Sequence, residues 1–164
     1  MNAFVGSGLL WGVRMLVPEA GVAETELSCR CALVSRAMPK EIVSTEDAPK
    51  GLAGYSQAVK ANGLVFVSGQ GPFDPATGDV VGETIQEQTR QCLRNVEAIL
   101  KAAGSSIESV LQATFILDDE SDFAGMNEEW SRWFLDQPPA RQGAQLPIRP
   151  KGMRISIAAI ATTS

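Results

Sequence analysis

The residues best suited to binding a small anion lie between Pro138 and Gly143, where the chain reads Pro-Pro-Ala-Arg-Gln-Gly. Two consecutive prolines cannot continue the amphipathic helix expected before them, so the chain must turn and begin a new strand near Arg141. A guanidinium is planar and permanently charged, and its paired donors match a carboxylate better than a lysine does. The segment therefore predicts a carboxylate clamp. The plainer alternative is a surface arginine paired with a nearby acid.

The composition restricts the chemistry available to such a site. The chain has 164 residues and no histidine, and its 14 Lys and Arg against 19 Asp and Glu give a net charge of −5. Without histidine there is no Ser-His or Cys-His nucleophile pair and no imidazole metal ligand. Catalysis must then use carboxylates, arginine, hydroxyls or backbone dipoles. The acidic balance, with no basic cluster, argues against nucleic acid as a partner.

Cysteine usage indicates a reducing compartment, and the hydropathy indicates no membrane-spanning helix. Cys29, Cys31 and Cys92 are odd in number, and the first two are too close in sequence to bridge easily. Two cysteines without histidine leave a metal site incomplete, so no metal or cofactor is expected. No apolar run approaches the roughly 20 residues that a membrane helix needs. We expect a cytoplasmic protein, with organellar targeting by residues 1–37 as the open alternative.

Residues 1–37 differ from the remainder of the chain. A transit peptide is basic and poor in acids, whereas the arginines here are balanced by glutamates. We expect these residues to be an unstructured extension or the product of an upstream start. A single domain of residues 38–164 then begins at Met38, and it is long enough to bury a continuous core.

The domain should contain several strands and two helices. Turn residues separate apolar runs, and Asn62-Gly63 is typical of a two-residue hairpin. Thr84 and Glu87 form a possible capping box before a helix that Gly104 ends, and Cys92 lies on its apolar stripe. The expected strands are Ser56–Lys60, Leu64–Ser68, Val110–Leu117, Gly143–Ile148 and Met153–Ala161.

The second helix begins after the acidic turn that follows the third strand. Ser121 or Asp122 can cap it, and Asn127 lies at the edge of its apolar face. An amide in that position either caps a neighbouring loop or belongs to a site, because burying it without partners is unfavourable. The residues of the apolar face are Phe123, Met126, Trp130, Trp133 and Phe134.

This order of elements predicts an α+β fold, a mixed sheet with both helices on one face. The second face of the sheet is then left bare. The strands Leu64–Val67 and Ile155–Ile160 are apolar or small on both faces. We therefore expect an oligomer that covers the second face.

Several spaced motifs, in order, resemble the RidA (YjgF) family of reactive intermediate deaminases, from about Glu41 to Ala161. The resemblance implies a chorismate-mutase-like fold, a homotrimer with clefts between subunits, and no cofactor or metal. It also implies hydrolysis of imines and enamines of 2-amino acids, such as 2-aminoacrylate or 2-iminopropanoate, to 2-oxo acids and ammonia. The motifs are Gly54-Tyr55-Ser56-Gln57-Ala58, Val65-Phe66-Val67-Ser68-Gly69-Gln70, Asp74-Pro75-Ala76-Thr77-Gly78, Ser121-Asp122-Phe123, Asn127, Pro139-Ala140-Arg141 and Ile157-Ala158-Ala159-Ile160-Ala161.

By this resemblance Arg141 grips the substrate carboxylate and the backbone at Gly143 adds contacts from the same subunit. Four further residues would come from the neighbouring subunit: Tyr55, Ser68, Gly69 and Asn127. Without the family, Tyr55 is equally well a packed aromatic ring. Ser68 is then a strand-end hydroxyl and Gly69 a turn glycine.

The chain departs from the family pattern where catalysis is expected. The deaminases usually carry a glutamate in the last strand, and the matching position is Ser156, with Ala158 at the second frequent glutamate. Gly143 stands where a cysteine is often found. Ser156 or backbone carbonyls would then hold the attacking water. The alternative is a non-catalytic trimeric protein that binds small carboxylates or 2-oxo acids. Family members have also been labelled endoribonucleases, which the lack of histidine and the acidic balance disfavour.

Overall fold

The structure is a computed structural model, and it describes residues 39–51, 54–145 and 150–163. The expected extension of residues 1–37 and the expected start at Met38 lie outside these ranges. Cys29 and Cys31 lie outside them as well, as do residues 146–148 of the strand expected after the proline turn.

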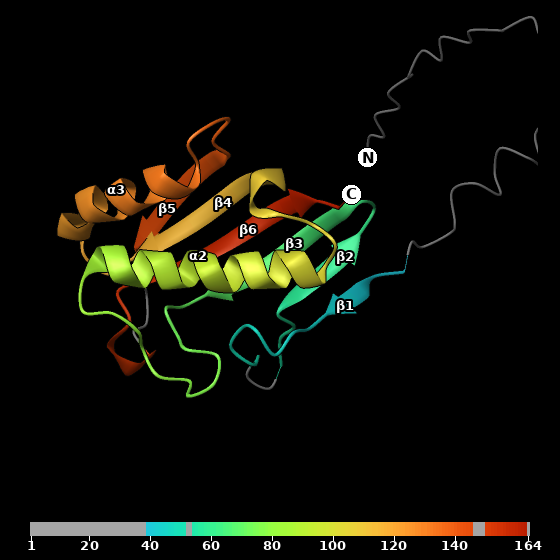
Figure 1. Cartoon of the computed structure of the whole chain (residues 1–164), viewed down its shortest axis with the longest axis horizontal. Coiled ribbons are helices and arrows are strands. Elements are labelled where there is room, and N and C mark those ends of the chain that lie inside the picture. Colours follow the sequence, from blue (N-terminus) through green and yellow to red (C-terminus); the bar gives the residue numbers. More distant parts are fainter. Residues whose placement is uncertain (1–38, 52–53, 146–149, 164) are drawn as a thin grey trace, which may run out of the picture. The chain divides into compact units, whose positions relative to one another are not determined.

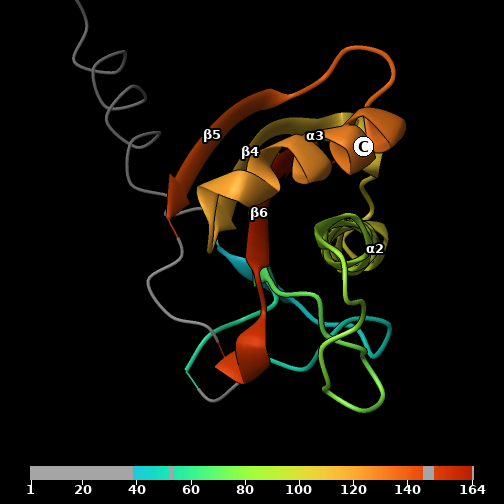
Figure 2. The same cartoon turned by 90° about the vertical axis from the view of Figure 1, so that its left-hand side faces the viewer.

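The described residues form one mixed sheet with strand order β1-β2-β3-β6-β4-β5, and both long helices lie on one face of it (Figures 1 and 2). Only the β4–β5 pair is parallel. This arrangement confirms the predicted α+β class with two helices on one face. The elements are β1 (Glu41–Val43), β2 (Ala58–Ala61), β3 (Leu64–Gln70), α2 (Ile85–Ala102), β4 (Val110–Leu117), α3 (Phe123–Trp133), β5 (Ala140–Gln145) and β6 (Ile155–Thr162).

Two boundaries follow from local turn chemistry. Asn62 and Gly63 have φ of 52° and 75°, the left-handed pair that a tight hairpin between β2 and β3 requires. The capping box of α2 is also confirmed, since Glu87 N donates to Thr84 Oγ1 (3.3 Å) and Thr84 N donates to Glu87 Oε2 (3.0 Å). Gly104 follows the helix with φ of 74°. The prediction missed β1, whose three residues carry no periodic pattern.

The start of α3 differs from the prediction that Ser121 or Asp122 caps it. Asp122 occupies the cap position, but its side chain makes no capping bond. The buried carboxylate instead receives two hydrogen bonds from the guanidinium of Arg154, which precedes β6. Asp119 caps the preceding turn by accepting from Ser121 N (2.8 Å). Asp122, which the sequence predicted as a helix cap, is therefore paired with Arg154 instead.

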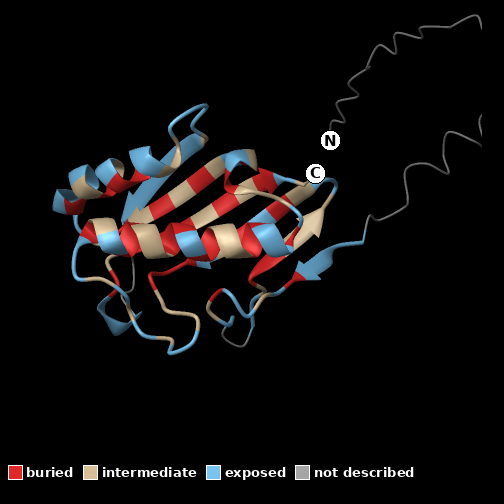
Figure 3. Ribbon diagram, in the orientation of Figure 1, coloured by how far each residue is buried: buried red, intermediate tan, exposed pale blue. Residues whose placement is uncertain are grey.

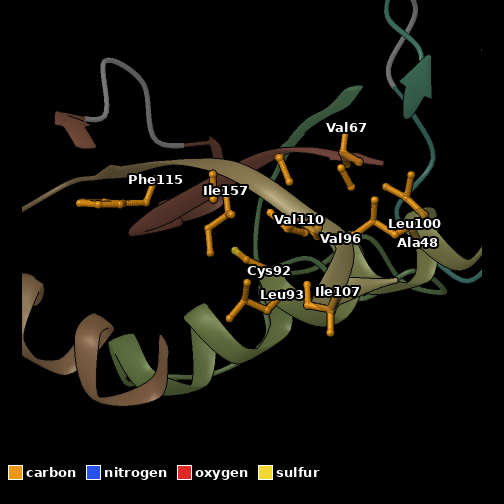
Figure 4. Close-up of a cluster of buried hydrophobic side chains, with 14 of the residues drawn as sticks. Ala48, Val67, Cys92, Leu93, Val96, Leu100, Ile107, Val110, Phe115 and Ile157 are labelled. Atoms are coloured by element: carbon orange, nitrogen blue, oxygen red, sulfur yellow. The ribbon is translucent and has the colours of Figure 1, made fainter. Parts of the chain in front are cut away.

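The core lies between α2 and the inner face of the sheet (Figure 3). Figure 4 shows Cys92, Leu93, Val96 and Leu100 of α2 packed among strand side chains. Cys92 is fully buried and its Sγ lies 3.7 Å from the carbonyl oxygen of Ile155. Burial raises the pKa of this thiol. The predicted core thiol is confirmed.

The opposite face of the sheet carries an exposed apolar row. Ile42, Val59, Phe66 and Ile160 are successive cross-strand partners in β1, β2, β3 and β6. Ile42 is 53% exposed and Phe66 is 42% exposed. Neighbouring side chains of one row contact each other on the same face of a sheet. The row agrees with the predicted bare face, and an apolar surface of this kind is typical of an interface.

A buried carboxylate joins the two helices. Glu129 of α3 is 2% exposed and accepts from Arg90 of α2 through Nε (2.8 Å) and Nη2 (2.7 Å). Arg132 Nη1 (3.1 Å) and the indole Nε1 of Trp133 (3.2 Å) also donate to it. The hydrogen bonds from Arg90 lower the pKa of Glu129 below its ordinary value of 4.5. The ion pair therefore fixes the position of α3 against α2.

Replacing Glu129 by glutamine should lower the free energy of unfolding at pH 7 by about 2–4 kcal/mol, because it removes the charge facing Arg90. Since the folded pKa is lowered, this stabilisation is fully present above about pH 4.5 and disappears as the pH falls further. Urea unfolding from pH 7 to pH 3.5 should thus show the gap between wild type and Glu129→Gln closing in acid. Glu128→Gln, a control at an exposed acid, should stay within about 0.5 kcal/mol of wild type. A gap that stays constant down to pH 3.5 would contradict this assignment.

Candidate functional site

Arg141, the second residue of β5, extends across aromatic side chains on the helix side of the sheet. Its Cζ lies 5.1 Å from the ring centroids of Phe115 and Trp130 and 5.9 Å from that of Phe123. Its Nη1 lies 4.0 Å from the sulfur of Met126. Aromatic faces attract a cation through their quadrupoles, and a guanidinium also stacks on them. The rings therefore orient the guanidinium.

The charge of Arg141 has no acidic partner within the described part of the chain. Every ion pair found among those residues involves other cations. Arg141 remains open to solvent, yet contact with the rings is enough to lower the pKa of its guanidinium by desolvation. It stays protonated at neutral pH. The surface ion pair considered as the alternative is not found there, and the donors stay available to an anionic ligand.

Gly143 lies two residues after Arg141 on the same strand and so on the same face. Its partner in the register of the parallel pair is Phe115. A Cβ built on Gly143 would lie 2.3 Å from Cζ of that ring, so any other residue here would require the ring to move. The glycine therefore leaves room for the Phe115 ring beside the guanidinium.

Four of the other predicted site residues line one cavity of about 780 Å³: Tyr55, Ser68, Gly69 and Ser156. The hydroxyl of Ser68 donates to the carbonyl oxygen of Ser56 (2.7 Å). A Cβ on Gly69 would lie 2.9 Å from Oγ of Ser156. The glycine thus leaves room for the Ser156 hydroxyl at the cavity wall, and the structure brings these residues together within one chain.

Arg141 and Ser156 belong to opposite faces of the sheet. Phe115 faces the helices, and its neighbour Ile116 pairs with Ser156 on β6. Because side chains alternate along a strand, Ser156 faces away from the helices, whereas Arg141 lies beside Phe115 on the helix side. Two residues expected to act on one ligand are therefore separated by the thickness of the sheet within a single chain.

Asn127 lies on α3, directly after Met126, and is half-buried. The resemblance placed it with Tyr55, Ser68 and Gly69, on the subunit opposite Arg141. Within one chain it lies on α3, the helix that Arg141 contacts, and its assignment to the neighbouring subunit stays a prediction. The predicted site residues therefore fall into two groups. The first, which we call the arginine half, consists of Asn127, Arg141 and Gly143, and the second, the serine half, consists of Tyr55, Ser68, Gly69 and Ser156.

Sequence reasoning missed the aromatic rings around Arg141. Trp130 and Phe123 were assigned to the apolar face of a helix, and Phe115 to a strand. Nothing in their spacing linked them to an arginine on another strand, because the contact depends on how α3 lies over β4 and β5. The signal in the sequence that could have indicated them is the large number of aromatic side chains on the apolar face of the second helix.

The described part of the chain offers neither a metal site nor a membrane-spanning helix. Within it, no three His, Cys, Asp or Glu side chains gather closely enough to hold a metal ion. In the same ranges, no helix has the length and apolar character to cross a membrane.

Known proteins match this chain over most of its length. A family model described as Endoribonuclease L-PSP matches residues 45–163. A RutC family protein of Pyrococcus horikoshii is 47% identical over 122 residues, covering 74% of this chain and 97% of the relative. Reactive Intermediate Deaminase A, chloroplastic, of Arabidopsis thaliana is 41% identical over 149 residues, covering 87% of this chain and 80% of the relative.

A third relative, from Capra hircus, is named 2-iminobutanoate/2-iminopropanoate deaminase and is 40% identical, covering 74% of this chain and 89% of the relative. Among solved structures, E. coli TdcF with bound serine is 36% identical with a TM-score of 0.71, covering 76% of this chain and 99% of TdcF. The chain belongs to the Endoribonuclease L-PSP family, which includes the RidA (YjgF) reactive intermediate deaminases.

Proposed function

We propose that this chain hydrolyses reactive imine and enamine intermediates of 2-amino acids, the class of 2-aminoacrylate and 2-iminopropanoate, to 2-oxo acids and ammonia. The observation that carries the proposal is the guanidinium of Arg141. It is oriented by three aromatic rings and has no carboxylate partner among the described residues. Every substrate of this class carries a carboxylate next to the reacting carbon. A fixed guanidinium binds it through paired hydrogen bonds.

The reaction mainly requires that the substrate and a water molecule are held in the correct positions. Water adds to the imine carbon, forming a new C–O bond while the C=N electron pair moves to nitrogen. The resulting carbinolamine then expels ammonia and becomes the 2-oxo acid, with the water protons ending on nitrogen. An imine already hydrolyses readily, so holding it beside an ordered water and a fixed positive charge lowers the barrier. Ser156 Oγ or backbone carbonyl oxygens at the cavity wall accept the hydrogen bond of that water.

The site requires two copies of the chain. The arginine half and the serine half face opposite sides of the sheet in one chain, so one ligand contacts both only if a second copy brings its own half across. The exposed row that includes Ile42 and Phe66 supplies an apolar surface for that copy. We therefore propose a homotrimer with sites between subunits and no metal or cofactor.

Relatives support the carboxylate-binding role. The goat relative is named for imine deamination, and TdcF was solved with serine, a 2-amino acid that carries a carboxylate. The family description mentions endoribonuclease activity. We do not extend that activity to this chain, because a net charge of −5 without histidine is poorly suited to gripping and cleaving a phosphate backbone.

One observation favours a second candidate function. Ser156 and Ala158 stand where the deaminases usually carry glutamates, so β6 offers no carboxylate to orient water. A positioned acid or base typically contributes about 100- to 10,000-fold to a rate. The alternative is thus a trimeric protein that binds small carboxylates or 2-oxo acids without turnover, using the same two halves of the site.

Arg141→Ala should abolish measurable binding of pyruvate and 2-oxobutanoate and lower turnover of 2-iminopropanoate by at least about 30-fold, because the substrate carboxylate loses its charged partner. Binding is measured by calorimetry and turnover by 2-oxo acid release from enzymatically generated imine. Arg94→Ala, at an exposed arginine of α2, is the matched control and should behave as wild type. Unchanged binding by Arg141→Ala would overturn the site.

Ser156→Glu separates the two candidate functions. If the wild type is a deaminase, it turns over imine in an Arg141-dependent way, and the new carboxylate raises the rate by about 100-fold or less. If the wild type only binds, it shows no turnover above the spontaneous rate while Ser156→Glu gains activity. Ammonia release measured side by side in the two proteins distinguishes these results.

Mixing two impaired variants tests whether the site lies between subunits. Arg141→Ala damages the arginine half, and Gly69→Ala pushes a methyl group against Ser156 in the serine half. When the two are unfolded and refolded together, about one quarter of the sites should combine two intact halves, because each site draws its halves from different copies. Turnover or 2-oxo acid binding should return to about that fraction of wild type. No recovery in mixed oligomers would place the whole site within one chain.

A further inference from the structure

The cavity at the serine half is larger than a three-carbon substrate needs. Its volume of about 780 Å³ lies in the range of about 300–1,000 Å³ typical of small-molecule pockets. It extends from Ser68, Gly69 and Ser156 to the loops 72–78 and 150–153. In the proposed function, the reacting carbon and its carboxylate lie at the end near Ser156. The remaining volume is available to the side chain of the substrate.

Part of the wall of this cavity is apolar. Its apolar lining residues include Phe73, Pro75, Pro150 and Met153. Gly71 also lines the cavity, and a Cβ there would lie 2.4 Å from Cε2 of Phe73 and 3.0 Å from the sulfur of Met153. The absence of a side chain at Gly71 therefore leaves room for both the ring and the thioether in this wall. Such a wall favours hydrocarbon over polar groups.

The two lysines that line the cavity are already paired. Lys151 Nζ donates to the carbonyl oxygen of Gly78 (2.6 Å) and to Asp79 Oδ1 (2.9 Å). Lys50 pairs with Glu46 (3.0 Å). Both ion pairs are exposed to solvent, so they engage the two lysines only weakly.

The acid of the lining is paired as well. Asp74 Oδ1 accepts from the backbone N–H groups of Ala76 (2.8 Å) and Thr77 (2.9 Å). These backbone hydrogen bonds also lower its pKa, so the turn holds it as an anion. The three charged groups of the lining thus each contact groups of the protein, and the apolar part of the wall is the part suited to a hydrocarbon side chain.

We propose that this cavity holds the substrate side chain, and that the chain prefers imines of 2-amino acids with long, branched or aromatic apolar side chains over two- and three-carbon ones. The inference rests on the proposed function and specifies its substrate class. Each methylene that fills such a pocket is worth about 10-fold or more in kcat/KM. The imine of leucine should then exceed that of alanine by at least about 10-fold.

The test compares imines generated in situ by an L-amino-acid oxidase from alanine, 2-aminobutanoate, leucine, methionine and phenylalanine. The ratio of kcat/KM for the leucine and alanine products is measured in wild type and in Phe73→Ala, where removal of the ring should lower it by about 10-fold. Leu135→Ala, at a side chain 87% exposed outside the cavity, is the control and should keep the wild-type ratio. A wild-type preference for the alanine product overturns the inference, as does a ratio that Phe73→Ala leaves unchanged.

A binding measurement on the wild type does not depend on turnover or on the folding of a variant. Calorimetry should show 4-methyl-2-oxopentanoate binding at least about 10-fold more tightly than pyruvate. If no imine is hydrolysed, the proposed deaminase activity fails while this order of affinities still tests the cavity. If imines are hydrolysed and pyruvate binds as tightly as the larger 2-oxo acid, the deaminase stands and the side-chain inference fails.

Discussion

The site depends on one interaction, the guanidinium of Arg141 held against aromatic faces rather than against a carboxylate. An arginine paired with an acidic side chain has its charge neutralised, so it attracts an anionic ligand less strongly. Phe115, Phe123 and Trp130 restrict its position without cancelling its charge. Two of the rings, Phe123 and Trp130, lie on α3, which the buried Glu129 carboxylate joins to α2. The ion pair in the helix layer is therefore indirectly a condition for anion binding at the sheet edge.

Strand alternation sets the second constraint. Residues of odd number on β5 face the helices, while Ser156 on β6 faces the bare side of the sheet. No side-chain rotation brings the two groups together in one chain. In this proposal, association of copies through the exposed row is therefore required to form the binding site. It also explains why a face that would be a liability in a monomer carries Phe66 and Ile42.

Sequence reasoning succeeded where the determinants are local. The capping box at Thr84, the hairpin at Asn62-Gly63 and the buried thiol of Cys92 each follow from a few neighbouring residues, and all are confirmed. It was wrong at the start of α3, because Asp122 has a distant partner in Arg154 that no local pattern reveals. The aromatic surroundings of Arg141 were missed for the same reason. They depend on the placement of α3 over the sheet.

The serine at position 156 is best understood together with the glycines near it. Gly69 leaves space for its hydroxyl, and Gly71 leaves space for Phe73 and Met153 in the cavity wall. A glutamate in that position would be larger than the serine and would occupy part of the cavity. A small hydroxyl keeps that volume open. Serine at position 156 thus orients the attacking water less well than a glutamate would, and it leaves more space for the substrate side chain. We therefore expect a slower reaction and larger substrates to occur together.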